Sequence, residues 1–206
     1  VCSSDLVLAG WTEEILFRGY PLQALAEEAG ATVAVGVTSL LFAVAHLANP
    51  GLGAALLDGL TLAEILPVLN LGLAGVVLGL AYWRTFSLWF ATGLHVGWNW
   101  MMGFLADLPV SGLEPDAPGF ALFDTPGWEA VISGHRLWTG GEFGPEGGLA
   151  VTLASLAGIG WLLRTDRLER GLRIRALRPL PDRGAGAPTG EGDATLMLLG
   201  IYADTG

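Results

Sequence analysis

The sequence contains no lysine, so its ten basic residues are all arginine. Its single cysteine, Cys2, excludes an intrachain disulfide and a cysteine-based zinc site. Charged residues make up 15% of the 206 residues, whereas a soluble domain usually carries about 25%. With 52% hydrophobic residues, the chain has too little charge to cover a water-facing surface. These shortages exclude an ordinary soluble domain and a largely disordered chain, and they indicate an integral membrane protein.

The net charge of −10 excludes the basic surface that nucleic-acid binding requires. Most of the arginines instead cluster between Arg164 and Arg183, directly after the last apolar stretch. Membrane proteins keep such clusters on the cytoplasmic side. We therefore expect residues 49–62 and 106–146 outside the cell and Arg84 inside. The missing lysine and the many Ala, Gly, Leu and Arg residues suggest a GC-rich bacterial genome.

Several apolar stretches approach the ~20 helical residues that cross a hydrocarbon core about 30 Å thick. The candidate spans are residues 31–48, 63–83, 87–105 and 148–163, with a fifth stretch, 6–20, that contains three charged residues. Pro21 is expected to end or kink the helix 6–20, and residues 22–28 are amphipathic and expected at the interface. Because the runs are continuous rather than alternating, we predict an all-α, polytopic transmembrane helix bundle in the cell membrane.

This pattern divides the chain into four parts. Residues 1–105 form the membrane core that carries the polar motifs. Residues 106–147 form an extramembrane, acidic loop rich in Gly and Pro. Residues 148–165 form the last transmembrane helix, and residues 166–206 form a cytoplasmic tail that is first basic and then disordered.

Only a few large polar side chains interrupt the apolar stretches. They are Glu13, Glu14, Arg18, His46, His95 and Asn99, with Asn70 as a lesser case. An ionisable group in hydrocarbon is costly, so each is a candidate for a functional site. One such residue alone is more often a packing residue, but six with complementary chemistry favour a site.

The first motif, Glu13-Glu14-x-x-x-Arg18, gives its two acids different surroundings. Glu14 and Arg18 share one helical face in the order that favours an ion pair. Glu13 lies about 100° around the helix, where a low dielectric would suit a general base. The alternative is that both acids share Arg18 as a structural cluster.

The other motifs are Phe42-x-x-x-His46 and His95-x-x-x-Asn99, and each pair shares a helical face. His95 and Asn99 offer N–H donors along one helix, which suits the stabilisation of an oxyanion. His46 would orient a water molecule together with Glu13. If the helices are straight and cross the membrane fully, however, Glu13 and His46 lie at different depths, unless residues 22–30 already rise into the bilayer.

Three motifs in this order, EExxxR, FxxxH and HxxxN, resemble the CPBP family of intramembrane proteases, which includes CAAX prenyl endopeptidases and Abi-type bacterial proteins. The resemblance covers about residues 6–105. It implies a glutamate-type endopeptidase that acts on a membrane-associated peptide or protein and needs no metal or other cofactor. It also implies that membrane helices before residue 1 are missing here.

The roles that the resemblance implies follow the motifs. Glu13 would act as the general base on water, assisted by His46, and His95 and Asn99 would form the oxyanion hole. Glu14 and Arg18 would order the site, and Phe42 would pack.

Two alternatives stay open. Glu13, His46 and His95 suit a catalytic zinc ion, although no HExxH motif occurs. The chain could also be a non-enzymatic scaffold or immunity protein that binds a partner through the same cavity. Nothing in the sequence identifies the substrate or the oligomeric state.

Overall fold

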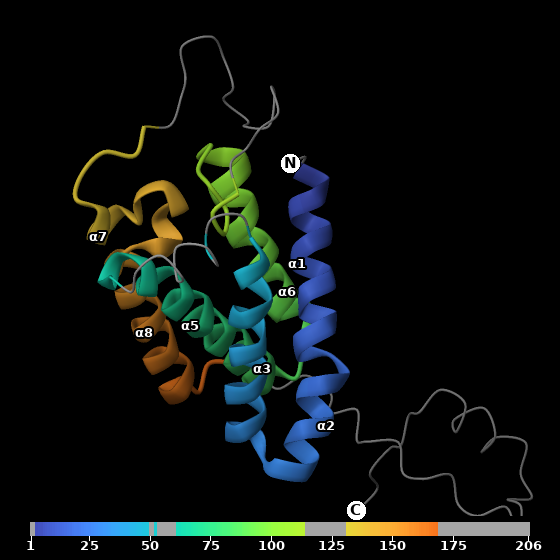
Figure 1. The fold of residues 1–206 in the computed structure, drawn as a ribbon. Coiled ribbons are helices and arrows are strands. Elements are labelled where there is room, and N and C mark those ends of the chain that lie inside the picture. Colours follow the sequence, from blue (N-terminus) through green and yellow to red (C-terminus); the bar gives the residue numbers. More distant parts are fainter. Residues whose placement is uncertain (1–2, 50–51, 53–60, 114–130, 169–206) are drawn as a thin grey trace, which may run out of the picture. The chain divides into compact units, whose positions relative to one another are not determined.

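The computed structural model describes residues 3–49, 52, 61–113 and 131–168, and in these residues the chain is helical without a β-strand. Figure 1 shows the long helices packed side by side. Their bounds are α1 Ser3–Arg18, α2 Tyr20–Ala29, α3 Ala31–Ala45, α5 Leu62–Thr85, α6 Leu88–Asn99, α7 Arg136–Thr139 and α8 Leu149–Arg164. The predicted all-α class is thereby confirmed.

Only two of the predicted spans are long and apolar enough to cross a membrane. These are Ala31–Ala48, which is α3 with the following 3₁₀ turn, and α5. α1 and α8 have 16 residues each and α6 has 12, which is short of the ~20 that a span requires. The predicted span 87–105 comprises α6 and a π-helical turn, Trp100–Leu105, that follows it directly.

The helix boundaries have local causes in the sequence. α5 begins with a capping box in which Thr61 and Glu64 satisfy each other's backbone N–H groups. α6 begins where the Ser87 hydroxyl accepts a hydrogen bond from the Phe90 N–H group. α1 ends before Gly19, where a Cβ atom would lie 2.3 Å from the carbonyl oxygen of Ile15. Glycine is therefore required at this sharp break.

The break at Gly19 explains how Glu13 and His46 reach the same level. α2 continues away from α1, and α3 returns alongside both helices (Figure 1). At about 1.5 Å per residue, the path from Glu13 down to Ala29 and the path from Ala31 back to His46 are both roughly 22–24 Å long. The depth mismatch disappears because α2 packs as part of this helical hairpin, with Leu22 buried against α3.

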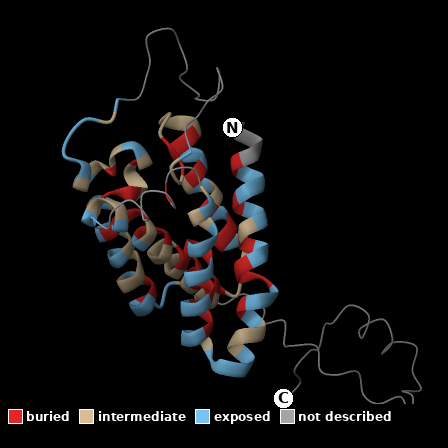
Figure 2. Cartoon of the chain, in the orientation of Figure 1, coloured by how far each residue is buried: buried red, intermediate tan, exposed pale blue. Residues whose placement is uncertain are grey.

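α5 occupies the centre of the fold and packs against α3, α6 and α8. A Cβ atom on Gly75 would lie 2.9 Å from the Cα atom of Ser39, so the α3 and α5 backbones approach closely there. Gly79 similarly faces Val35. Figure 2 shows the buried residues on the facing sides of the helices and the exposed ones on the outer sides. Small residues at this crossing thus set the distance between the two helices.

Hydrogen bonds connect segments distant in sequence at both ends of the helices. At one end, the Arg84 guanidinium donates to the carbonyl oxygen of Thr165. At the other, the Asn49 side chain donates to the carbonyl oxygen of Ser111 at 2.9 Å. Which end is cytoplasmic stays a prediction, since most of the basic segment and of the tail 166–206 lies outside the described residues.

The predicted acidic loop is folded in part. Residues 136–147 form α7 and two 3₁₀ turns, Gly141–Phe143 and Pro145–Gly147, which pack against α5 and α8. Residues 114–130 of this loop lie outside the described part of the chain.

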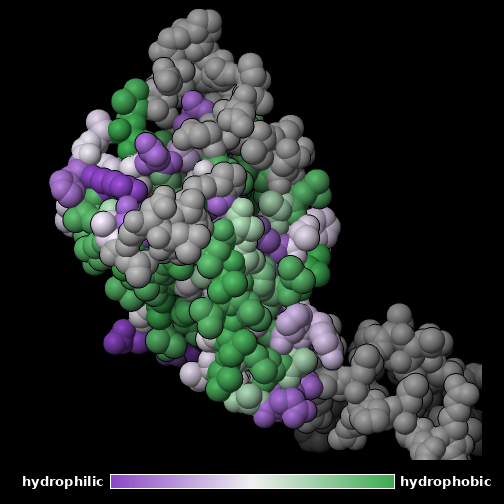
Figure 3. All heavy atoms as spheres, in the orientation of Figure 1, coloured by the Kyte–Doolittle hydropathy of each residue, from purple (hydrophilic) through white to green (hydrophobic). Residues whose placement is uncertain are grey.

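The outer surface carries many apolar side chains. Leu8 and Leu16 on α1, Leu40 on α3 and Trp89 on α6 are all more than half exposed. Figure 3 shows an apolar band across the middle of the face on which α3 lies, with polar side chains gathered toward the two ends. Contiguous apolar surface of this kind marks contact with a membrane or with other protein.

Candidate active site

The Glu14–Arg18 pair is fully buried between the helices. The two side chains have 0% exposure, and Arg18 Nη1 lies 2.8 Å from Glu14 Oε1. The same carboxylate oxygen lies 2.8 Å from His95 Nδ1, so the pair also connects α1 to α6. The predicted ion pair is therefore present, and it includes a histidine that the sequence pattern did not assign to it.

Arg18 also fixes α3 and α5. Its Nη2 atom donates to the Gly75 carbonyl oxygen at 3.2 Å, and its guanidinium lies 4.5 Å from the centre of the Phe42 ring. The same ring contacts His46 at 4.5 Å and His95 at 5.8 Å between ring centres. Phe42 is thus the common neighbour of the arginine and both histidines.

Glu13 faces a different surface from Glu14. Its side chain is 28% exposed, and its Oε2 atom lies 3.9 Å from His46 Nε2 and 3.8 Å from His95 Nε2. Oε2 is buried and makes no hydrogen bond within the described part of the chain. Separations of this size are too long for direct hydrogen bonds and suit a bridging water molecule or substrate atom.

The hydrogen bonds of the two imidazoles determine which nitrogen carries the proton. His46 Nδ1 lies 2.8 Å from the Phe42 carbonyl oxygen, which only accepts, so Nδ1 must donate. His95 Nδ1 faces the Glu14 carboxylate and donates likewise when that carboxylate is ionised. In each neutral ring the lone pair then resides on Nε2, the atom that faces Glu13. A hydroxyl or water group placed among these acceptors would donate to them.

Asn99 lies one turn after His95 on α6. The residue is buried, with 7% exposure. Together with His95 it borders a groove of about 200 Å³ between α5, α6 and α8. The structure thus places all six predicted residues in one region, with Glu13, Glu14, Arg18, His46 and His95 connected by contacts and Asn99 beside them.

The zinc alternative is not better supported than the metal-independent one. Within the described ranges, no group of three or more His, Cys, Asp or Glu side chains is arranged to hold a metal ion.

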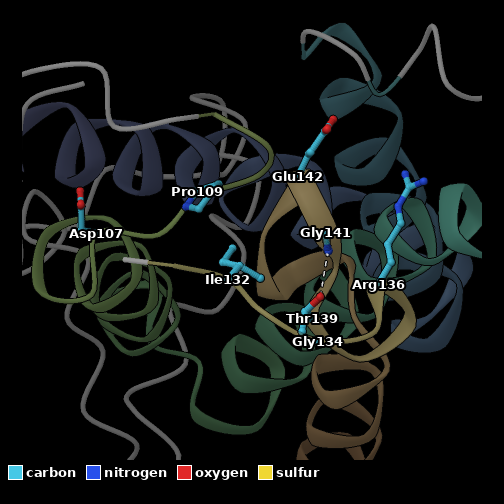
Figure 4. A pocket seen from close by; sticks show the side chains of 8 residues that line it. All are labelled: Asp107, Pro109, Ile132, Gly134, Arg136, Thr139, Gly141 and Glu142. Carbon is cyan, nitrogen blue, oxygen red and sulfur yellow. Dashed lines mark hydrogen bonds between the residues drawn. The ribbon is translucent and has the colours of Figure 1, made fainter. Parts of the chain in front are cut away.

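A second, larger cavity of about 510 Å³ lies near α7 (Figure 4). Its acidic side chains, Asp107 and Glu142, lie apart in this view, and Arg136 is paired with Glu64 at 3.9 Å. None of the predicted site residues lines it. This cavity therefore lacks the paired acid and base of the Glu13 region.

Sequence reasoning missed Glu146, which it left in the acidic loop. The Glu146 carboxylate accepts hydrogen bonds from Trp98 Nε1 at 2.7 Å and from the Ser111 backbone N–H group. Asn70, which had been a lesser candidate, donates to the carbonyl oxygens of Glu146 and Gly148. The only signal in the sequence was a polar Asn70 within an apolar run, which pointed to a partner without identifying it.

The fold and the site together define a helical protein whose buried centre combines two glutamates, an arginine and two histidines. Residues 3–101 match the family model described as type II CAAX prenyl endopeptidase Rce1-like. This match confirms the resemblance to the CPBP family, and it covers about half of the chain, residues 3–101. No curated protein and no solved structure matches the chain.

Proposed function

We propose that the protein is an intramembrane endopeptidase that hydrolyses a peptide bond with a water molecule activated by Glu13 and without a metal ion. The observation that carries this proposal is the convergence of Glu13 Oε2 on the Nε2 atoms of His46 and His95 at 3.8–3.9 Å. A water molecule that donates its protons to Glu13 and to His46 Nε2 directs a lone pair away from them, toward a substrate carbonyl.

Glu13 alone can perform both proton transfers of the reaction. As water attacks the carbonyl carbon, Glu13 takes one of its protons, and a tetrahedral oxyanion forms. Glu13 then gives this proton to the leaving nitrogen, the C–N bond breaks, and a carboxylic acid and an amine are released. The partial exposure of Glu13, against the complete burial of Glu14, supports this division of roles.

Asn99 is the oxyanion donor in this proposal. Its amide N–H group needs no change of protonation, whereas His95 Nε2 donates only when both ring nitrogens carry protons, because Nδ1 faces Glu14. One such preorganised donor typically contributes about 10²–10³-fold in kcat. His95 is then the second donor only in its doubly protonated form.

Glu14 and Arg18 position the site instead of reacting. The buried pair holds His95 by its Nδ1 atom and holds Phe42 by its ring, and both groups face the Glu13 centre. The surrounding apolar surface and the two candidate spans support a multi-pass location in the cell membrane, with a membrane-associated peptide or protein as the substrate.

The proposal is tested with Glu13→Gln in the purified protein in lipid nanodiscs. Cleavage of labelled membrane peptides, followed by mass spectrometry, is expected to disappear, because an amide cannot take the proton from water. Glu28→Gln, an exposed site on α2, is the matched control and should cleave like the wild type. Cleavage by Glu13→Gln at the wild-type rate would contradict the role of Glu13.

A further inference from the structure

A third glutamate, Glu146, lies beside the Glu13 centre, and the proposed reaction does not use it. Glu146 borders the same groove of about 200 Å³ as His95 and Asn99. It belongs to the predicted acidic loop, outside the part of the chain that matches the family model. Its role must therefore follow from its own contacts.

Both oxygens of the Glu146 carboxylate accept hydrogen bonds from the protein. Oε1 accepts from Trp98 Nε1 at 2.7 Å, and Oε2 accepts from the Ser111 backbone N–H group. An ionised carboxylate only accepts, so it matches two N–H donors. The proposed general base is different, because Glu13 Oε2 makes no hydrogen bond within the described residues. Glu146 is thus suited to hold two segments together and not to take a proton from water.

The first of these segments is the end of α6. Trp98 directly precedes Asn99, the proposed oxyanion donor, and lies three residues after His95. α6 ends at Asn99, and the next residues form the π-helical turn Trp100–Leu105. π-helical turns are rare and occur frequently at functional sites. The hydrogen bond from Trp98 to Glu146 therefore fixes α6 where its hydrogen-bond pattern changes and where the oxyanion donor lies.

The second segment is the turn 110–113, whose flanking residues exchange both backbone hydrogen bonds. Within it, Ser111 has a φ angle of 51°, in the left-handed region that disfavours a residue with a side chain. Its N–H group donates to Glu146, and its carbonyl oxygen accepts from the Asn49 side chain at 2.9 Å. Backbone strain of this kind persists only where the surrounding structure fixes it. Glu146 and Asn49 supply these contacts.

Asn49 extends the connection to the end of α3. Its backbone N–H group donates to the His46 carbonyl oxygen at 3.0 Å and closes the 3₁₀ turn that begins at His46. Hydrogen bonds thus lead from this turn, through the turn 110–113 and Glu146, to the end of α6. His46 is the proposed partner of the attacking water, and Asn99 is the proposed oxyanion donor. The position of Glu146 therefore affects the distance between these two groups.

Glu146 is itself held from α5 and α8. The Asn70 side chain on α5 is buried, and it donates to the carbonyl oxygens of Glu146 and Gly148 at 2.7 and 2.9 Å. Its oxygen accepts from the Thr152 hydroxyl on α8 at 2.7 Å. The backbone at Glu146 is therefore fixed to two rigid helices, as a group that orients a reaction centre requires.

We propose that Glu146 is a positioning residue for peptide hydrolysis, whose carboxylate holds the end of α6 that carries Asn99 in place relative to His46. The inference rests on the proposed peptidase function and adds a residue that acts through others and does not touch the reacting atoms. Misplacement of a catalytic group by about 1 Å can cost about a hundredfold in rate. Loss of Glu146 therefore lowers kcat and changes KM little.

The test measures kcat and KM of Glu146→Ala and Glu146→Gln on labelled membrane peptides in lipid nanodiscs, at a temperature where every variant is folded. Glu146→Ala should lower kcat by about 10–100-fold, with KM within about twofold of the wild type. Glu146→Gln retains one accepting oxygen and should lie between the two. Trp98→Phe removes the same contact, so the double variant Trp98→Phe/Glu146→Ala should lower kcat by less than the product of the single effects.

Arg84→Met is the matched control. It deletes a hydrogen bond between distant segments at the opposite end of the helices, from Arg84 to the Thr165 carbonyl oxygen. It should keep the wild-type kcat. The positioning role is overturned if Arg84→Met and Glu146→Ala lose kcat equally, or if Glu146→Ala loses only stability.

The contact itself is tested without cleavage, by the indole N–H resonances in a proton–nitrogen NMR spectrum. The Trp98 resonance, identified by its absence in Trp98→Phe, should move upfield in Glu146→Ala because its carboxylate acceptor is removed. An unmoved resonance would overturn the inference even if the wild type cleaves peptides. A wild type that cleaves no peptide although the resonance moves would overturn the peptidase function, and the catalytic role of the contact with it.

Discussion

Removal of Arg18 is expected to destabilise the protein more than any surface substitution. Arg18→Met deletes the 2.8 Å contact with Glu14 and the 3.2 Å hydrogen bond to the Gly75 carbonyl oxygen. It also removes the cation over the Phe42 ring, at 4.5 Å. What remains is a fully buried carboxylate whose only charged or polar neighbour among these contacts is His95.

The magnitude follows from the burial of the pair. Removing one partner of a buried ion pair costs about 3–5 kcal/mol, because the other charge is left uncompensated. A protein that is stable by about 5–15 kcal/mol loses a large share of its free energy of unfolding in this way. The assay is unfolding followed by tryptophan fluorescence, in the same detergent for every variant. Arg164→Met, at an exposed site on α8, should stay within about 0.5 kcal/mol of the wild type.

The double variant Glu14→Gln/Arg18→Met separates the charge effect from the packing effect. A glutamine retains an oxygen that accepts from His95 Nδ1, and the uncompensated charge is gone. The double variant should therefore be more stable than Arg18→Met by about 1–3 kcal/mol. The reasoning is refuted if Arg18→Met unfolds like the wild type, or if the effects of the two single substitutions simply add.

Three further outcomes are expected. Asn99→Ala should lower kcat by about 10²–10³-fold with little change in KM, and a change confined to KM would assign it to substrate binding instead. Gly75→Val should cost about 1–3 kcal/mol in an unfolding assay by forcing α3 and α5 apart, unlike Gly72→Val, and equal stability of the two would disprove the close approach. Glu146→Ala should cost about 1–3 kcal/mol, and Glu146→Gln should lose less, because its single amide oxygen still accepts one of the two hydrogen bonds, from Trp98 or from the Ser111 N–H group; identical losses in both variants would argue against this role.

The positions of most helices could be predicted from apolar runs and helix-breaking residues. The predicted spans 63–83 and 148–163 correspond to α5, Leu62–Thr85, and α8, Leu149–Arg164. The predicted stretch 87–105 corresponds to α6, Leu88–Asn99, followed directly by the π-helical turn Trp100–Leu105, and an apolar composition does not distinguish these two kinds of helix. Tertiary contacts decide such a change of hydrogen-bond pattern.

The residues that form the site could be predicted from the sequence, but the contacts between them could not. Spacing of four residues placed Glu14 with Arg18 and separated Glu13 from them, and both features are present. The contact between His95 and the Glu14 carboxylate depends on how α1 and α6 are rotated relative to each other. No local sequence pattern encodes that rotation, so the contact could not be predicted. Glu146 looked like a solvated loop residue because its partner Trp98 is distant in sequence.

Cleavage of a labelled membrane peptide by the wild type and by Glu13→Gln, each with and without a zinc chelator, tests the central claim most directly. The glutamate mechanism predicts wild-type cleavage that continues in the chelator, and no cleavage by Glu13→Gln in either condition. Cleavage that stops in the chelator and returns when zinc is added would contradict the metal-independent mechanism. A folded wild type that cleaves none of the peptides would contradict the peptidase function and favour a scaffold that binds a partner at this site.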